Sequence, residues 1–192
     1  MLAADADILI IPGWSGSEED HWQSRWQRNL KTAHRVEQED WYEPDLSAWT
    51  ERIRVGVEDA KCPVVLVAHS LGVIATVHAA PLLNKAKVAG AFLVAPADVD
   101  HTDRWPVTQG YDPCTAIHGF APAPLTPMPF PAMLVASAND PYCEFERAKT
   151  LAEAWGATLV ETGACGHLNV NSGHGPWPEG LLTFGVFIKE LG

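Results

Sequence analysis

The segment that decides the fold is residues 64–73, which read VVLVAHSLGV. It opens with a continuous apolar run, as expected of a strand whose two faces are both buried. The turn AHSLG (residues 68–72) follows, and the apolar stretch 71–80 after it is predicted to form a helix. A strand, a sharp turn and a helix around G-x-S-x-G, here with Ala68 in place of the first glycine, are typical of a nucleophile elbow. The segment therefore predicts that Ser70 stands exposed at the carboxyl end of a strand.

The elbow needs small residues on both sides of the serine, because the strand and the helix nearly touch there. Ala68 adds only one methyl group relative to glycine, so the turn is expected to survive. An alternative interpretation is that Ser70 caps the helix that begins at Leu71, which is a common use of serine. The strand before the turn and the helix after it favour the elbow.

Apolar runs alternate with amphipathic stretches on both sides of this segment. The runs expected to form strands are residues 7–11, 64–68, 88–94, 132–136 and 158–161, with a weaker one at 35–38. Helices are expected at residues 22–30, 46–57, 71–80, 144–155 and 179–191. Such alternation implies right-handed crossovers and a mostly parallel sheet that is covered on both sides.

The composition suits one domain over residues 1–192, and a chain of that size buries roughly 70% of the surface of its unfolded form. The 24 Asp and Glu residues against 13 Lys and Arg residues give a formal net charge of −11. A surface with that charge repels polyanions, so nucleic acid is not an expected partner. No stretch approaches the ~20 apolar residues that span a bilayer, so no membrane association is expected.

The amino terminus indicates a cytoplasmic protein. It reads MLAADADILI, with no basic segment before the apolar run and with Asp5 and Asp7 where a signal peptide avoids acids. The four cysteines form no C-x-x-C pair, and they are Cys62, Cys114, Cys143 and Cys165. In a reducing cytosol we expect unpaired thiols, and no neighbour of Cys143 or Cys165 in the sequence favours a redox role.

Two further segments place a carboxylate and an imidazole after strands. Asp140 comes four residues after an apolar run in AMLVASANDPYC, and His167 comes six residues after the next run in LVETGACGHLNV. The carboxyl ends of parallel strands meet at one edge of a sheet, so both side chains are expected near Ser70. A serine hydroxyl becomes a good nucleophile when a base takes its proton, and the base needs an acid to fix its tautomer. The order Ser, Asp, His in the chain therefore predicts Ser70 as nucleophile, Asp140 as acid and His167 as base.

These assignments have alternatives. Asp140 lies in Asn-Asp-Pro, which is strong turn chemistry by itself, and His167 is equally compatible with a loop or core histidine. Asp98 and Asp100 follow the preceding strand and are alternative acids, while His174 is an alternative base.

Acyl transfer also needs hydrogen-bond donors aimed at the oxyanion, and one such donor is worth ~3–4 kcal/mol. The backbone N–H of Leu71, directly after the nucleophile, is the first candidate. The backbone N–H of Trp14 is the second, because Pro12-Gly13 ends the first strand with a turn. His21 and His69 are expected at the rim of the same site, although His21 suits a surface role equally well.

The proline-rich segment 97–131 has no clear periodicity and is expected near the carboxyl edge of the sheet. Trp105, Tyr111 and Phe120 within it are candidates to line the apolar side of the site.

The ordered set PGW, HWQSRW, AHSLG, NDP and GHLN, spread from Pro12 to Asn169, resembles the small serine hydrolases related to retinoblastoma-binding protein nine. The resemblance implies a single-domain α/β-hydrolase fold with a mostly parallel sheet of about six strands and no large lid domain. It matches the nucleophile, acid and base of that family to Ser70, Asp140 and His167. The motif L-x-C-x-E is absent, so retinoblastoma-type protein binding is not expected.

The sequence therefore predicts a serine esterase that cleaves small carboxylic esters through an acyl-enzyme, with thioesters and amides as further candidate substrates. No organic cofactor is required, and the histidines show no metal-binding spacing, so no metal is expected. One alternative is a non-catalytic protein-binding module on a hydrolase scaffold. Another is an acyltransferase or perhydrolase that uses the same triad.

Overall fold

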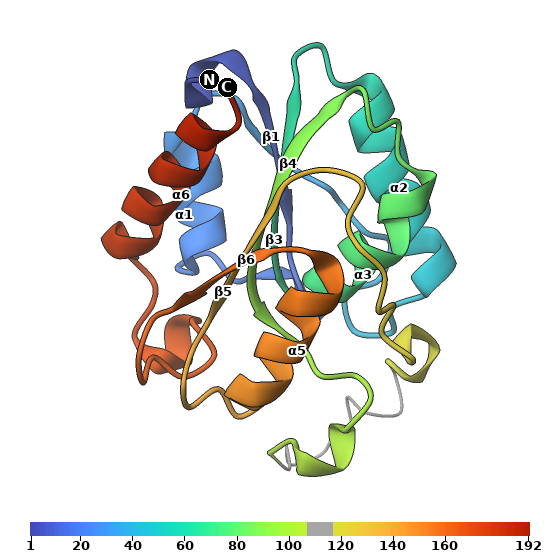
Figure 1. Ribbon diagram of the computed structural model, residues 1–192, viewed down its shortest axis with the longest axis vertical. Coiled ribbons are helices and arrows are strands. Elements are labelled where there is room, and N and C mark those ends of the chain that lie inside the picture. Colours follow the sequence, from blue (N-terminus) through green and yellow to red (C-terminus); the bar gives the residue numbers. More distant parts are fainter. Residues whose placement is uncertain (107–116) are drawn as a thin grey trace.

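A six-stranded parallel sheet forms the centre of the protein in the computed structural model, which describes residues 1–106 and 117–192 (Figure 1). The strands are β1 (Asp7–Ile11), β2 (Ala33–Arg35), β3 (Val64–Ser70), β4 (Val88–Pro96), β5 (Ala132–Ala136) and β6 (Thr158–Glu161). Their order in the sheet is β2-β1-β3-β4-β5-β6. The chain thus runs outward from β1 to β2 and returns to the other side of β1. The carboxyl ends of β1 and β3 form the switch point at which open α/β sheets bind ligands.

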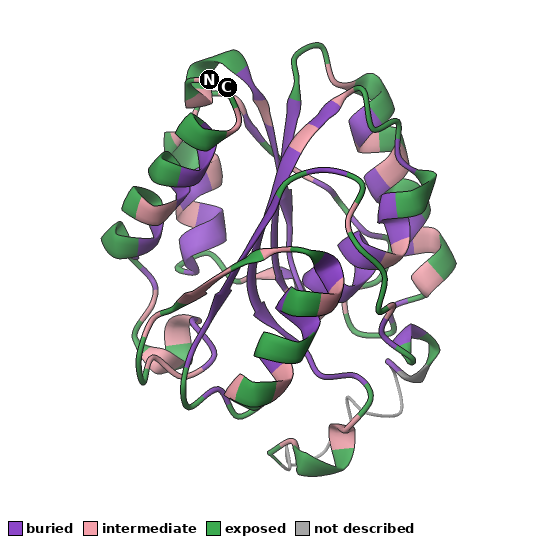
Figure 2. Ribbon diagram, in the orientation of Figure 1, coloured by how far each residue is buried: buried purple, intermediate pink, exposed green. Residues whose placement is uncertain are grey.

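Helices cover both faces of the sheet, which separates the core into two layers (Figures 1 and 2). Helices α1 (Trp22–Asn29) and α6 (Pro178–Glu190) pack on one face, and α2 (Leu46–Asp59), α3 (Leu71–Ala79) and α5 (Phe145–Trp155) pack on the other. The strands between them are almost entirely buried, as Figure 2 shows. This explains the continuous apolar runs, since a strand covered on both faces has no solvent side.

The alternation of side chains along β3 sets the position of the residue before the serine. Val65 and Val67 pack toward α1 and α6, while Val64 and Leu66 pack toward the opposite layer. A period of two therefore directs the side chain of His69 to the α1 side of the sheet.

The strands differ from the sequence-based expectation at their ends. β3 continues to Ser70 and β4 to Pro96, because these residues still pair with each other across the ladder. The weak strand expected at residues 35–38 forms two residues earlier, as β2. This edge strand pairs with β1 only through Ala33–Arg35, and the chain leaves the sheet after the bond from the Val36 N–H to the Ile10 carbonyl.

The described part of segment 97–131 packs on the side of the sheet that is covered by α2, α3 and α5. It contains two short 3-10 helices, Thr102–Arg104 and His118–Phe120. Phe120 is fully buried, and its ring meets that of Trp49 at 5.7 Å. Tyr111 and Cys114 lie outside the described residues. No helix among residues 1–106 and 117–192 is long and apolar enough to cross a membrane.

Candidate active site

Ser70 occupies the turn between β3 and α3 with the strained backbone of an elbow. Its φ is 56° and its ψ is −125°, a conformation that costs a non-glycine residue of order 1–3 kcal/mol. Its side chain makes no capping bond to helix α3, which argues against the helix-cap interpretation. Gly72 shows why the turn needs a small residue, since a Cβ there would lie 2.4 Å from the carbonyl oxygens of Ile11 and Pro12. The end of β1 therefore presses directly on the start of α3.

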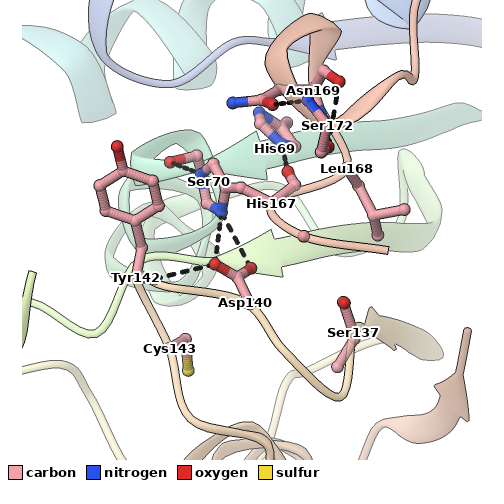
Figure 3. A network of polar contacts seen from close by, with 12 residues as sticks. His69, Ser70, Ser137, Asp140, Tyr142, Cys143, His167, Leu168, Asn169 and Ser172 are labelled. Atoms are coloured by element: carbon pink, nitrogen blue, oxygen red, sulfur yellow. Dashed lines mark hydrogen bonds and ion pairs between the residues drawn. The ribbon is translucent and has the colours of Figure 1, made fainter. Parts of the chain in front are cut away.

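The structure brings Ser70, His167 and Asp140 into one hydrogen-bonded line (Figure 3). The Ser70 Oγ lies 2.8 Å from Nε2 of His167. On the other side of the ring, Nδ1 lies 2.9 Å from both carboxylate oxygens of Asp140. The side chains of His167 and Asp140 are only 8% and 2% exposed. A carboxylate acceptor at Nδ1 fixes the proton there and leaves the Nε2 lone pair free to accept the serine proton.

The carboxylate of Asp140 makes no ion pair with Arg or Lys among the described residues, so its only ionisable partner there is His167. It accepts one further bond, from the Tyr142 N–H at 2.9 Å, which closes a tight turn after Asp140. The ring of Tyr142 packs at 4.5 Å from that of His167. Burial, with a smaller effect from the Asp140 charge, raises the pKa of the Tyr142 phenol.

Three side chains from separate elements hold the backbone around His167. The Gly166 N–H donates to Asn139 Oδ1 at 2.7 Å, and the His167 carbonyl accepts from Nε2 of His69 at 2.9 Å. The Leu168 carbonyl accepts from the indole N–H of Trp22 at 2.9 Å. Gly166 and Leu168 have φ of 59° and 49°, so these bonds also hold backbone that Leu168 adopts only under strain.

Sequence reasoning missed all three supports, although it expected His69 at the rim of the site. Trp22 fits the apolar face of a helix, and Asn139 fits a turn, so neither pattern predicts a bond to the loop that carries His167, here called the base loop. Asn139 also accepts a bond from the Ser137 hydroxyl at 3.0 Å, and Ser137 Oγ in turn accepts from the Cys165 N–H at 2.9 Å. This pair joins the loop of Asp140 to the loop of His167.

The turn after β1 brings Trp14 beside the elbow. A Cβ on Gly13 would lie 2.8 Å from Ser70 Cβ and 3.0 Å from the Leu71 nitrogen, so the Gly13-Trp14 backbone runs against the start of α3. Leu71 is the first residue of that helix, and the first-turn N–H groups of a helix have no acceptor within it. The backbone N–H groups of Leu71 and Trp14 thus belong to segments in contact beside Ser70.

A cavity of about 390 Å³ opens over this arrangement. Its wall includes three polar groups of residues: the Ser70–His167 pair, the segment with Ser15, Ser17, Glu18 and His21, and Asn169 with Asn171. The apolar part of the wall consists of Trp14, Leu71, Ala97, Trp105, Ile117 and Tyr142. Of the aromatic residues expected there from segment 97–131, Trp105 lines the cavity, whereas Phe120 lies in the core and Tyr111 is outside the described residues.

His21 and His69 both line this cavity, but they are buried in its wall and do not form an exposed rim. Their rings meet at 4.8 Å, and the ring of His69 lies 4.9 Å from that of His167. Burial lowers the pKa of His21 to about 3, with smaller effects from His167 and Arg35. Burial also lowers the pKa of His69 well below its usual value, so both rings are neutral at pH 7.

The alternative acids and base lie elsewhere. Asp98 contacts Arg147 and His101, and Asp100 also pairs with Arg147, so neither is placed beside His167. His174 bonds to the Ser172 hydroxyl at 3.1 Å.

No group of three or more His, Cys, Asp and Glu residues in the described ranges is placed to hold a metal ion. The Cys143 thiol is buried beside Asp98 and Asp140, which raises its pKa, so it stays protonated.

The sequence from residue 8 to residue 185 matches the family model described as serine hydrolase. The chain belongs to the serine hydrolase family. It is an enzyme of the serine hydrolase type, and the resemblance predicted from its motifs is confirmed.

Solved structures place this serine hydrolase among the α/β hydrolases. A putative YdeN-like hydrolase from Pectobacterium atrosepticum is 32% identical, with a TM-score of 0.82 over 97% of this chain and 92% of that one. The ydeN gene product of Bacillus subtilis is 19% identical, with a TM-score of 0.72 over 95% and 98% of the two chains. Alpha/beta hydrolase domain-containing protein 10 from mouse is also 19% identical, with a TM-score of 0.70 over 96% and 90%. No curated protein matches the chain by sequence.

Proposed function

We propose that this serine hydrolase cleaves small carboxylic esters through an acyl-enzyme formed on Ser70. The observation that supports this most strongly is the line from Ser70 Oγ through His167 to Asp140, with contacts of 2.8 and 2.9 Å. These distances are within hydrogen-bond reach, so proton transfer needs no rearrangement of the three side chains.

In the first step, Ser70 Oγ attacks the ester carbonyl while Nε2 of His167 takes the hydroxyl proton. Asp140 stabilises the resulting imidazolium, and the N–H groups of Leu71 and Trp14 donate to the oxyanion. The carbonyl then reforms, the C–O bond to the leaving group breaks, and His167 gives its proton to the departing alcohol.

In the second step, a water molecule gives its proton to Nε2 of His167 and attacks the acyl carbon. Collapse of this second tetrahedral intermediate returns the proton to Ser70 and releases the acid. No step uses a metal or organic cofactor.

The cavity supports a small-molecule acyl substrate. Its volume of about 390 Å³ is at the low end of the ~300–1,000 Å³ usual for ligand sites, which favours short acyl and alcohol groups. Thioesters and amides present the same carbonyl geometry and are further candidates. A nucleic acid or a retinoblastoma-type partner does not fit this proposal, since the net charge is −11 and L-x-C-x-E is absent.

The first experiment is labelling of the purified protein with a fluorescent fluorophosphonate, together with hydrolysis of p-nitrophenyl butyrate. We expect labelling of the wild type, and loss of both label and hydrolysis by at least about 10³-fold in Ser70→Ala and His167→Ala. Ser47→Ala serves as a control for serine removal, because Ser47 is exposed on α2 and does not line the cavity, and it should still label. Thermal melting confirms that each variant is folded.

A folded wild type that neither labels nor hydrolyses the ester contradicts the proposal. Labelling that persists in Ser70→Ala contradicts the assignment of the nucleophile.

A further inference from the structure

Two residues that line the cavity each carry a buried N–H donor without a hydrogen-bond acceptor. Across residues 1–106 and 117–192, only three buried side-chain nitrogen or oxygen atoms lack a partner: Nε2 of His21, Nε1 of Trp105 and Oε1 of Gln38. The first two belong to residues that line the cavity beside Ser70, whereas Gln38 does not line it. An unpaired buried polar group is costly, so native proteins leave few of them and tend to do so at functional sites.

The proton on His21 is assigned by its own helix. His21 caps the start of α1, and its Nδ1 accepts a bond from the Gln23 N–H at 3.2 Å. An accepting Nδ1 carries no proton, so the neutral ring holds its proton on Nε2. The two nitrogens lie on opposite sides of the ring, so Nε2–H faces away from the capped helix end.

His21 is also held firmly in place. Its neighbour Gln23 is fully buried, and the Gln23 amide donates to the carbonyls of Ile11 and Val67 at 3.2 and 3.1 Å. The His21 ring packs against Trp22 at 5.4 Å and against His69 at 4.8 Å, and it is 2% exposed. A donor fixed in this way loses little entropy when it binds an acceptor.

The charges around the cavity select the kind of acceptor. The cavity lining in the described chain includes the carboxylate of Glu18 but no Lys or Arg. His21 itself is uncharged, and the protein carries a net charge of −11. An anionic group would therefore meet repulsion without a compensating cation, whereas a neutral oxygen would not.

We propose that Nε2–H of His21, together with Nε1–H of Trp105, forms a substrate subsite for a neutral oxygen acceptor close to the scissile ester. Ether, hydroxyl and amide carbonyl oxygens fit this chemistry, and plain alkyl esters and anionic esters do not. The subsite deepens the proposed esterase function and rests on it, and it makes His21 and Trp105 specificity-determining residues.

The test compares esters that differ only by an oxygen in place of a methylene. For the acyl side the pair is p-nitrophenyl 3-methoxypropanoate and p-nitrophenyl pentanoate. For the alcohol side it is 2-methoxyethyl butanoate and butyl butanoate. The measured quantity is the ratio of kcat/KM within each pair, which cancels general loss of activity.

The variants separate the donor from the helix cap. His21→Asn keeps a good capping acceptor at the start of α1 but has no donor at the position of Nε2. Trp105→Phe keeps an aromatic ring and removes the N–H together with one ring of the indole. Gln38→Met is the matched control, because it removes an unpaired buried atom that does not line the cavity.

We expect the wild type to favour the oxygen-containing ester of at least one pair by about 3- to 10-fold, as one hydrogen bond between neutral groups gives. His21→Asn should bring that ratio to about one, Trp105→Phe should lower it, and Gln38→Met should leave it unchanged. A preference in only one ester pair shows whether the subsite binds the acyl side or the alcohol side of the ester. A wild-type ratio near one in both pairs, or a preference that survives in His21→Asn, overturns the proposal.

Binding without turnover distinguishes this proposal from the esterase proposal. The same esters are titrated calorimetrically into Ser70→Ala and into Ser70→Ala with His21→Asn. Tighter binding of the oxygen-containing ester that disappears with His21→Asn supports the subsite even if the wild type fails to hydrolyse any ester. Equal binding within both pairs overturns the subsite even if the wild type is an active esterase.

Discussion

Two Asp–His pairs lie on the same edge of the sheet, and they are nearly identical in length. Asp140 and His167 are joined at 2.9 Å, and Asp98 and His101 at 2.8 Å. Both carboxylates follow a central strand, Asp98 after β4 and Asp140 after β5. A short contact between carboxylate and imidazole therefore does not by itself distinguish a catalytic pair from a structural one.

The two pairs differ in burial and in what else the carboxylate binds. The side chain of His101 is 45% exposed, against 8% for His167. Asp98 also forms an ion pair with Arg147, which partly neutralises the Asp98 carboxylate. The Asp140 carboxylate, by contrast, contacts only His167 and a backbone N–H among the described residues. Only His167 has a serine at its second ring nitrogen. The comparison favours Asp140 over Asp98 as the acid of the proposed mechanism, because its carboxylate pairs with no cationic Arg or Lys and its histidine has both ring nitrogens in hydrogen bonds.

The largest effect is expected from exchanging the acid in each pair. Asp140→Asn should lower kcat for p-nitrophenyl butyrate by about 10³–10⁴-fold, because the amide permits the wrong tautomer and removes the charge that stabilises the imidazolium. Asp98→Asn should change kcat by less than about 3-fold. The measurement is steady-state kinetics on both variants. If kcat of Asp98→Asn falls as far as that of Asp140→Asn, Asp98 remains a candidate for the acid.

The next effect concerns the support of the Asp140–His167 pair. Asn139→Ala removes the acceptor of the Gly166 N–H and should lower kcat by about 10- to 100-fold with little change in KM, because the base loop shifts relative to Ser70. Asn139→Asp keeps an acceptor oxygen for the Gly166 N–H, now from a carboxylate, and should recover most of the loss in kcat. If Asn139→Asp is no better than Asn139→Ala, the bond to Gly166 does not position the base.

The support of the second pair should affect stability and leave the rate alone. The Arg147 side chain is 16% exposed and contacts both Asp98 and Asp100. Arg147→Gln should therefore lower the free energy of unfolding by about 2 kcal/mol, with kcat within about 2-fold of the wild type. Urea denaturation measures the first quantity and the ester assay the second. A large fall in kcat with unchanged stability would mean that the Asp98–His101 pair takes part in the reaction and does not serve stability.

The last effect is a dependence of stability on pH. His21 has its pKa lowered from 6.5 to about 3, and that of His69 is also lowered, both chiefly by burial. Below pH 6.5 the unfolded chain therefore binds protons at these residues that the folded chain does not, so stability falls as the pH falls. We expect a loss of about 1 kcal/mol per pH unit from His21 between pH 6 and pH 4, and a further loss of the same sign from His69, measured by urea denaturation. His21→Asn should reduce this slope, because it removes one of the two buried imidazoles.

The sequence predicted that Ser70, Asp140 and His167 meet at one edge, because each of them follows a strand at a short distance. Ser70, Asp140 and His167 lie at the ends of β3, β5 and β6, and the parallel topology forces these ends to one edge. The same rule also placed Asp98 and Asp100 there as alternatives to Asp140, and it does not by itself exclude them. The choice depends on Arg147, which lies 49 residues from Asp98 in the chain and has no signal in the local pattern.

The hydrogen bonds that hold the base loop could not be predicted from the sequence either, because they join residues that are far apart in the chain. The bond from Trp22 to the Leu168 carbonyl spans 146 positions, and that from His69 to the His167 carbonyl spans 98. Both side chains have an adequate local role, as a helix core residue and as the residue before the serine. Burial of His21 was equally hidden, because a histidine at the start of a helix is exposed or buried according to what packs above it.

The separation of Ser70 from His167 by 97 positions has a consequence during synthesis of the protein. The elbow leaves the ribosome about 100 residues before the base, at a stage when β5 and β6 do not yet exist. A serine without its base is a poor nucleophile, so the nascent chain is chemically inert until almost all of it has emerged. Under the proposed function, a chain truncated before residue 167 lacks the base, so incomplete copies of this enzyme would have no activated Ser70.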